Sequence, residues 1–327
     1  MKSLVCFGEA LIDLLQDPKQ AGVYHANAGG APANVAVGFA KLGGNALFTG
    51  TLGRDKFADF LFEEFTRYGV NTNSIVRTDA AYTAMAIISL AANGERSFGF
   101  YRETSADLLF TAADFNAADF ADAPLFHFCS NTLTHAPIRA ATHAGVALAH
   151  AHTCIISFDI NIRASLWPDT TLLIAEITKL MRQAHILKCS VEEWQQLCGG
   201  HDEAALLKRC FAACTQLVLI TDGENPLRII TQGSDEMLAV KPVKVVDSTA
   251  AGDAFMAGFL FALAHQNMPK ESLKKRISNH RWLHEALKFA SQCGAHACTQ
   301  YGAFASLATT TDVTFPAALS LPAQTNS

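Results

Sequence analysis

The chain has 327 residues, half of them hydrophobic and 17% charged, with a formal net charge of −5. This length and composition fit one large globular α/β domain or two smaller ones. The charge is not gathered into a basic block, so nucleic acid is not expected as a partner, because its binding relies on clustered Lys and Arg.

Hydrophobic residues are spread along the chain, and no apolar run reaches the roughly 20 residues that span a bilayer. The N-terminus also lacks the long apolar core of a leader segment, so no membrane partner is expected. The nine cysteines are scattered and form no Cys-x-x-Cys pair. This usage is typical of reduced thiols and favours a cytoplasmic location.

The first predicted strand, Leu4–Phe7, is followed by a polar Asp13 behind an apolar pair. The next segment, 28–34, reads Ala-Gly-Gly-Ala-Pro-Ala-Asn, and its glycines and proline are expected to end whatever precedes it. A helix is predicted over 35–42, where apolar and small residues alternate before a Gly-Gly pair. Taken alone, these segments are a surface turn and a helix cap.

Two further strands are predicted over 83–90 and 96–101, on either side of an Ala-Asn-Gly-Glu turn at 92–95. Together with a strand-like piece near 22–26, this hairpin is expected to form a small sheet beside the main domain. Arg102 follows the second strand and, taken alone, is an exposed charge at a strand end.

The predicted strand 154–158 leads into Asp159, Asn161 and Arg163, which alternate along the chain. Alternation places these polar side chains on one side at the carboxyl end of a strand, where open α/β sheets bind ligands. A salt-bridged strand end is the simpler alternative.

Strands are also predicted over 186–189 and 217–221. Ser190 and Glu193 follow the first of them, where Glu193 fits an acid in the first turn of a helix. Gly223 lies in the turn after the second strand.

The segment Asp247–Gly258 carries the strongest signal for chemistry. It reads Asp-Ser-Thr-Ala-Ala-Gly-Asp-Ala-Phe-Met-Ala-Gly, between a strand-like run at 243–246 and a helical run at 254–264. Small residues at a helix N-terminus let an anion approach backbone amides, and a nearby carboxylate can accept a hydroxyl proton. In isolation, Asp253 would simply cap the helix.

The last predicted helix covers 280–298 and starts with His280 and His284, four residues apart. This spacing suits a metal, but no third ligand lies beside them in the sequence, so a surface or core pair is expected. Residues 316–327 are rich in Ala, Pro and Thr and are expected to form a flexible tail.

Two segments resemble the signatures of the ribokinase-like (PfkB) carbohydrate kinases. The stretch 247–253 is similar to Asp-Thr-x-Gly-Ala-Gly-Asp, and the stretch 29–34 is similar to Gly-Gly-x-x-x-Asn with a later Leu-Gly. Ala250 stands where that family usually has Gly, and Pro226 replaces the last Gly of its nucleotide turn. The resemblance extends over roughly residues 3 to 310.

This resemblance implies a three-layer α/β/α, Rossmann-like domain over residues 1–315. It further implies a small β-sheet lid, formed by segments near 14–30 and 82–105, that closes over the sugar. Lid sheets of this kind often pair two subunits, which implies a homodimer.

The resemblance also implies roles for individual residues. Asp253 would be the base, with the amides of Ala250, Ala251 and Gly252 holding the phosphate. The residues implied to bind sugar are Asp13, Gly29, Gly30, Asn34, Arg102 and Arg163. Those implied to bind ATP are Ser190, Glu193, Thr221, Gly223, Ala290 and Cys293. Glu193 would orient Mg²⁺ through water, and a K⁺ site would involve Asp247, Thr249, Ala297, Gln300, Gly302 and Ser306.

Two segments, Tyr101-Arg102 and Asp159-x-Asn161-x-Arg163, are similar to those of fructokinases. The activity implied is ATP-dependent phosphorylation of fructose to fructose 6-phosphate. The alternatives are kinases of 2-keto-3-deoxygluconate or aminoimidazole riboside and, more remotely, a non-catalytic fructokinase-like binding protein.

Overall fold

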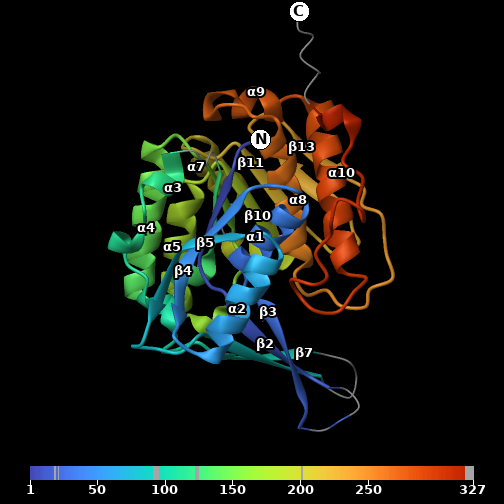
Figure 1. Cartoon of the computed structure of the whole chain (residues 1–327). Helices are drawn as coiled ribbons and strands as arrows, with labels where there is room; N and C mark the ends of the chain where they lie inside the picture. Colours follow the sequence, from blue (N-terminus) through green and yellow to red (C-terminus); the bar gives the residue numbers. More distant parts are fainter. Residues whose placement is uncertain (18–19, 21, 91–95, 122–124, 200–201, 321–327) are drawn as a thin grey trace, which may run out of the picture.

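A nine-stranded sheet forms the centre of the computed structural model (Figure 1). The structure describes the chain apart from residues 18–19, 21, 91–95, 122–124, 200–201 and 321–327. In spatial order the strands are β13 (Asp235–Leu238), β12 (Leu227–Ile230), β11 (Leu217–Thr221), β10 (Ile186–Ser190), β9 (Ile155–Asp159), β8 (Leu125–Cys129), β1 (Leu4–Phe7), β4 (Ala46–Gly53) and β5 (Asn71–Thr78). Adjacent strands from β11 to β5 pair in parallel. In contrast, β12 pairs antiparallel with β11, and β13 pairs antiparallel with β12.

Helices cover both faces of this sheet (Figure 1). They are α1 (Ala31–Lys41), α2 (Lys56–Arg67), α3 (Ala118–Ala121), α4 (Ala136–Ala151), α5 (Thr170–Met181), α6 (Val191–Cys198), α7 (Glu203–Phe211), α8 (Ala251–His265), α9 (Leu273–Ile277) and α10 (His280–Ala297). Alternate residues of β1 enter two separate cores: Leu4 and Cys6 join one, and Val5 and Phe7 join the other. The three-layer α/β/α architecture predicted from the sequence is confirmed.

A smaller sheet of four strands lies at one end of the domain (Figure 1). Its order is β3 (Tyr24–Gly29), β2 (Leu11–Gln16), β6 (Met85–Leu90) and β7 (Arg96–Tyr101). The predicted Asn-Gly turn falls in 91–95, outside the described residues, but β6 and β7 pair antiparallel on either side of it. The small sheet predicted beside the main domain is thus present.

Strand β1 lies inside the sheet, with a parallel neighbour on each side. β1 pairs with β4 on one side and with β8 on the other, and β9 follows β8. All of these strands are parallel, so their carboxyl ends meet at one edge. This is the switch point at which open α/β sheets bind ligands.

Three local expectations need correction. α1 begins at Ala31, not at residue 35, because Pro32 sits in the first turn, where proline is tolerated. Residues 243–246 form no strand, and Val245 is 60% exposed. Part of the expected flexible tail is ordered: Ala317–Leu319 is a 3₁₀ turn whose Leu319 is buried in the core.

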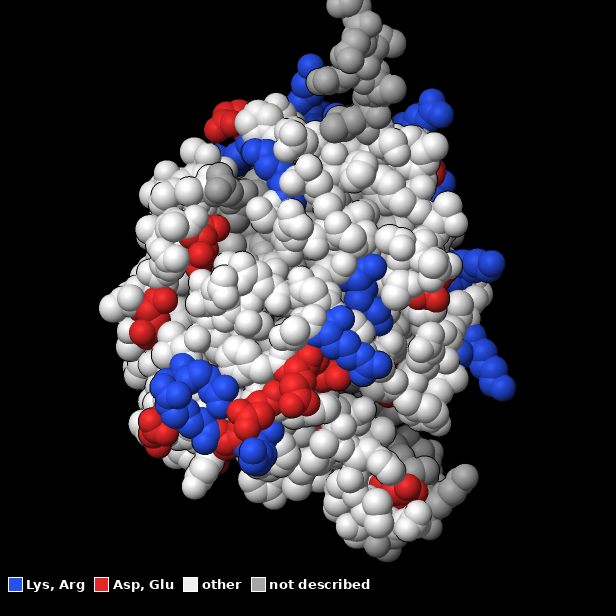
Figure 2. Space-filling view, viewed as in Figure 1, with Lys and Arg blue, Asp and Glu red and all other residues white. Residues whose placement is uncertain are grey.

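The outer surface carries mixed charge. Figure 2 shows side chains of both signs gathered in a band over α2, where Lys56 pairs with Asp59 and Arg67 with Glu64. Exposed pairs of this kind contribute little to stability. Among the described residues, no helix has the length and apolar character needed to cross a bilayer.

Candidate active site

Helix α8 begins with a turn that has no side-chain cap. Ala250 precedes the helix with φ 59° and ψ 10°, in the left-handed region, and its side chain forms no capping hydrogen bond. The first amides of a helix lack intrahelical partners and carry partial positive charge, so this turn is suited to an anion. The carboxylate of Asp253, in the same turn, accepts a hydrogen bond from Asn34 Nδ2 at 2.7 Å. Asp253 is therefore not the N-cap of this helix.

The carboxyl group of Asp253 has a pKa well above the ordinary value. Burial and the nearby carboxylate of Asp159 raise the pKa of Asp253 to about 7, against the hydrogen bond from Asn34 and the positive charges of Lys188 and Arg163. A group with a pKa near the working pH combines proton affinity with a substantial ionised fraction.

A cavity of about 340 Å³ opens in front of this turn, at the carboxyl ends of β1, β8 and β9. Its lining brings together most of the residues that the sequence analysis assigned to the sugar. They are Asp13, Gly30, Asn34 and Arg163, and they face Ala250 and Asp253 across the same cavity. Glu9, Asn131 and Asn161 also line the cavity and were not assigned.

Close approach of the backbone explains the paired glycines. A methyl group on Gly29 would lie 2.3 Å from Asp13 Oδ2, and one on Gly30 would lie 2.5 Å from the Glu9 carbonyl oxygen. Gly30 also has φ 108°, which disfavours other residues. Burial and the charge of Asp247 raise the pKa of Asp13 to about 7, against the positive charge of Arg163.

Arg102 was expected to reach the sugar, but the structure buries it behind the cavity wall. Its Nε and Nη2 atoms lie 2.7 and 2.6 Å from Asp107 Oδ2, and Nη1 donates to the Asn131 carbonyl at 2.9 Å. Asn131 in turn donates to Glu9 Oε1 at 2.9 Å. Arg102 does not line the described cavity; it supports two residues that do. The sequence shows Asp107 but not that it would capture this guanidinium.

A second cavity, of about 410 Å³, lies on the other side of the same helix turn. Thr221 and Gly223, which the resemblance assigned to ATP, line it together with Ala251 and Gly252. Ser248 lines both cavities. The first turn of α8 therefore separates two binding spaces and exposes its residues to both.

Ala290 and Cys293 were expected beside the nucleotide, but they are buried against Gly258 of α8. A methyl group on Gly258 would lie 2.8 Å from Cys293 Sγ and 3.1 Å from Ala290 Cα. The second cavity is instead lined by Ser291, Gly294 and Ala295 of α10 and by Cys298 just after the helix. The helix is placed as expected, but a different stripe of it faces the cavity. The apolar run at 243–246 has a related explanation, because Val243 and Val245 line this cavity as well.

Glu193 combines a structural role with a place near the site. Its Oε2 accepts from the Ser190 amide and its Oε1 from the Ile162 amide, both at 2.8 Å, and Ser190 Oγ accepts from the Glu193 amide. This is a capping box. A carboxylate has further lone pairs, so the two bonds leave Glu193 able to accept from water.

Lys188 lies beside the candidate site and was not singled out from the sequence. It is buried on β10, and its Nζ lies 2.9 and 3.2 Å from the two oxygens of Asp159. A methyl group on Gly252 would lie only 2.6 Å from Lys188 Nζ, so this ammonium sits directly behind the first turn of α8. A lysine within the apolar strand sequence Ile-Leu-Lys-Cys was the signal, because lysine is rarely buried unless paired.

The residues assigned to a K⁺ site make the following side-chain contacts. Asp247 Oδ1 accepts from the Thr249 amide at 2.8 Å and Oδ2 from the Gly302 amide at 3.1 Å. In contrast, the side chain of Gln300 bonds His296, and the hydroxyl of Ser306 bonds the Ala303 carbonyl. Ala297 is fully buried in the core.

The strain at Ala250 leads to a prediction. An L-residue in the left-handed region costs roughly 1–2 kcal/mol, which glycine avoids. We expect Ala250→Gly to raise the free energy of unfolding by up to about 1 kcal/mol, measured by urea denaturation. Thr153→Gly, at φ 55° and distant in sequence from the α8 turn, is the matched control and should gain stability in the same way. Destabilisation by Ala250→Gly alone would show that the methyl group is supported by its surroundings.

Known proteins resemble this chain over most of its length. The model of the pfkB family carbohydrate kinases matches residues 1–310. Fructokinase-2 of Oryza sativa subsp. japonica is 36% identical, with 94% of this chain and 91% of the relative covered. The structure of a fructokinase with bound ATP from Xylella fastidiosa superposes with a TM-score of 0.89 and 40% identity, covering 95% of this chain and 96% of the other. A fructokinase from Vibrio cholerae O395 with fructose, ADP and calcium bound gives 0.84 and 32%, covering 95% and 97%.

Proposed function

The chain belongs to the pfkB family of carbohydrate kinases, and we propose that it is a fructokinase that transfers the γ-phosphate of ATP to the primary hydroxyl of fructose. The observation that carries the proposal is the position of α8. Its first turn separates two cavities, with Asp253 facing one and Gly252 facing the other. A sugar in the first cavity and a nucleotide in the second would meet at this turn.

The reaction follows from this arrangement. Asp253 takes the proton of the primary hydroxyl as its oxygen attacks the γ-phosphorus, and the bond to the β,γ-bridging oxygen breaks to release ADP. The amides of Ala250, Ala251 and Gly252 hold the charge on the phosphoryl group in flight. Lys188, behind Gly252, adds positive charge at the same place.

The sugar is held in the first cavity by Asp13, Asn34 and Arg163, with the Gly29–Gly30 backbone close beside them. Carboxylate, amide and guanidinium groups suit the adjacent hydroxyls of a sugar. Arg102 acts indirectly, because it bonds the carbonyl of the lining residue Asn131.

ATP is the proposed nucleotide, held by Thr221, Gly223 and the α10 residues of the second cavity. Mg²⁺ would be held by the phosphates of ATP and by water that Glu193 orients. When bound, it would neutralise phosphate charge. A K⁺ site near Asp247 and Thr249 would rest mainly on backbone carbonyls.

The small sheet is the proposed lid, and it is also the proposed dimer surface. The nine free cysteines support a cytoplasmic location.

The test is ADP release with Mg²⁺ and K⁺ present, across fructose, 2-keto-3-deoxygluconate, aminoimidazole riboside, ribose and glucose. We expect fructose to give the highest kcat/KM. Another sugar giving the highest value would keep the phosphoryl-transfer chemistry and overturn the substrate. Folded protein that binds ATP but releases no ADP with any of these sugars would favour the non-catalytic alternative.

A further inference from the structure

Helix α10 presents two histidines at its exposed N-terminal end. His280 and His284 lie one turn apart on one face of the helix, with side chains 59% and 33% exposed. They lie outside the lining of both cavities of the candidate active site. The sequence offered them no third partner.

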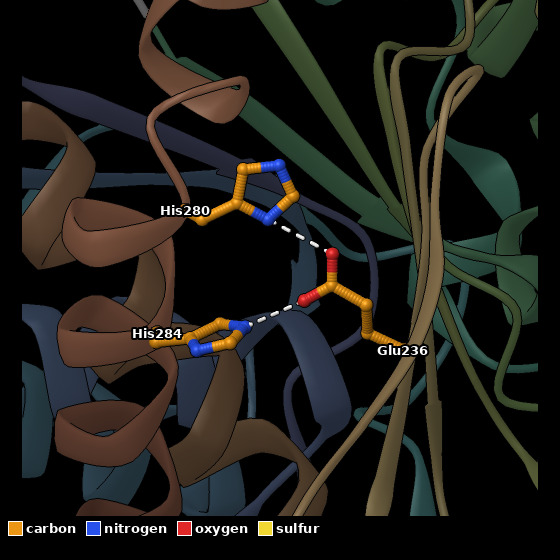
Figure 3. A group of neighbouring side chains, drawn as sticks. All are labelled: Glu236, His280 and His284. Carbon is orange, nitrogen blue, oxygen red and sulfur yellow. Dashed lines mark hydrogen bonds and ion pairs between the residues drawn. The ribbon is translucent and has the colours of Figure 1, made fainter.

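The structure supplies that partner from the edge of the sheet. Glu236 on β13 directs its two oxygens at the two rings: Oε1 lies 2.8 Å from His280 Nδ1, and Oε2 lies 2.9 Å from His284 Nε2 (Figure 3). The ligand atoms of these three residues all lie within 4.8 Å of one another. The two elements are more than 40 residues apart in sequence, which is why the spacing alone did not reveal the cluster.

We propose that Glu236, His280 and His284 form a Zn²⁺ site. Two imidazole nitrogens and one carboxylate oxygen are a known donor set for this ion, which prefers four ligands in a tetrahedral arrangement. Nitrogen donors disfavour Mg²⁺ and Ca²⁺, which take oxygen ligands. Exposure of His280 leaves room for water as the fourth ligand.

The site would fasten α10 to β13 without taking part in phosphoryl transfer. β13 is an edge strand, held in the sheet by β12 alone among the described strands. Further along, α10 carries Ser291, Gly294 and Ala295, which line the second cavity. By holding the N-terminal end of α10 in place, Zn²⁺ would therefore stabilise the part of this helix that lines the second cavity.

The alternative is that the two histidines only hydrogen-bond the carboxylate. Both explanations use the same three side chains, but only the metal site predicts that the protein binds Zn²⁺ and is stabilised by it. We would titrate the reduced, full-length chain with Zn²⁺ against a chromophoric chelator and record the thermal midpoint with and without Zn²⁺. His143→Ala is the matched control, because His143 makes a single ion pair with Glu176 at the same 2.9 Å distance.

We expect the wild type and His143→Ala to bind one Zn²⁺ ion with equal affinity and to gain thermal stability from it. His284→Ala should bind at least tenfold more weakly and gain none. If His284→Ala folds poorly, His280→Ala, at a more exposed position, replaces it. Equal affinity in the wild type and the His284 or His280 variant would overturn the proposal, as would a wild type that does not bind micromolar Zn²⁺.

Discussion

Replacing Asp253 by Asn is expected to lower kcat roughly 10²–10⁴-fold, the range that a positioned general base contributes. The amide keeps the size of the side chain and can still pair with Asn34, so the cavity retains its shape. It cannot accept the proton of the sugar hydroxyl. Steady-state kinetics at saturating ATP measures the loss, and calorimetric fructose binding is expected to stay close to that of the wild type.

The pH dependence gives the same prediction a second readout. The pKa of Asp253 is raised to about 7, so the wild-type kcat should fall as the pH drops below that value and the carboxylate becomes protonated. Asp13→Asn is the matched control, because Asp13 lines the same cavity and its pKa is also raised to about 7. That variant should raise KM for fructose more than it lowers kcat. Unchanged turnover in Asp253→Asn would remove this residue from the mechanism.

Stability must be separated from catalysis in this experiment. The pKa of Asp253 is higher in the folded chain than the value of about 3.9 in an unfolded chain. The folded state therefore binds more protons between these values, and its stability falls as the pH rises from about 4 to about 7. Above pH 7 the ionised carboxylate remains unfavourable. Asp253→Asn should thus be at least as stable as the wild type at pH 8.

The sequence predicts the fold well where a local pattern of residues has a single structural explanation. The apolar run at Leu4–Phe7 is a strand buried on both faces, and the periodic run from His280 is a long helix. Prediction fails where one pattern has two explanations. Residues 243–246 are apolar because Val243 and Val245 line a cavity, not because they pair in a sheet. Likewise, Pro32 starts a helix in a segment that sequence reasoning took as a stop.

The candidate site follows a similar rule. Asp13, Asn34 and Asp253 belong to short motifs with fixed spacing, and they do meet around one cavity. The positions of the Arg102 and Lys188 side chains depend on which carboxylate pairs with each buried cation. Those contacts, with Asp107 and Asp159, are set by packing between elements and not by spacing. Packing also decides which side of α10 faces the second cavity, because Gly258 leaves room for Ala290 and Cys293 in the interface between α8 and α10.

Lys188 is expected to be as necessary for turnover as the anion-binding amides. Its Nζ lies 2.9 Å from Asp159 Oδ2 and directly behind Gly252. Lys188→Met should lower kcat about 10²–10³-fold, the loss seen when one donor to a developing anion is removed. It should also destabilise the fold by about 3–5 kcal/mol, because Asp159 is left buried and unpaired. Steady-state kinetics and urea denaturation measure the two effects separately.

The double variant Asp159→Asn/Lys188→Met distinguishes a catalytic lysine from a mere counter-ion. Removing both charges abolishes the unpaired carboxylate, so most of the stability should return. Turnover should stay low, because nothing replaces the positive charge behind Gly252. If turnover returns together with stability, Lys188 serves only to neutralise Asp159, and the backbone amides of the α8 turn hold the phosphoryl group without it. Because Asp159 and Lys188 both shift the pKa of Asp253, turnover is compared well above that pKa, where Asp253 is ionised in every variant. Low turnover in a stable double variant under these conditions would indicate that the ammonium acts on the charge that develops on the phosphoryl group.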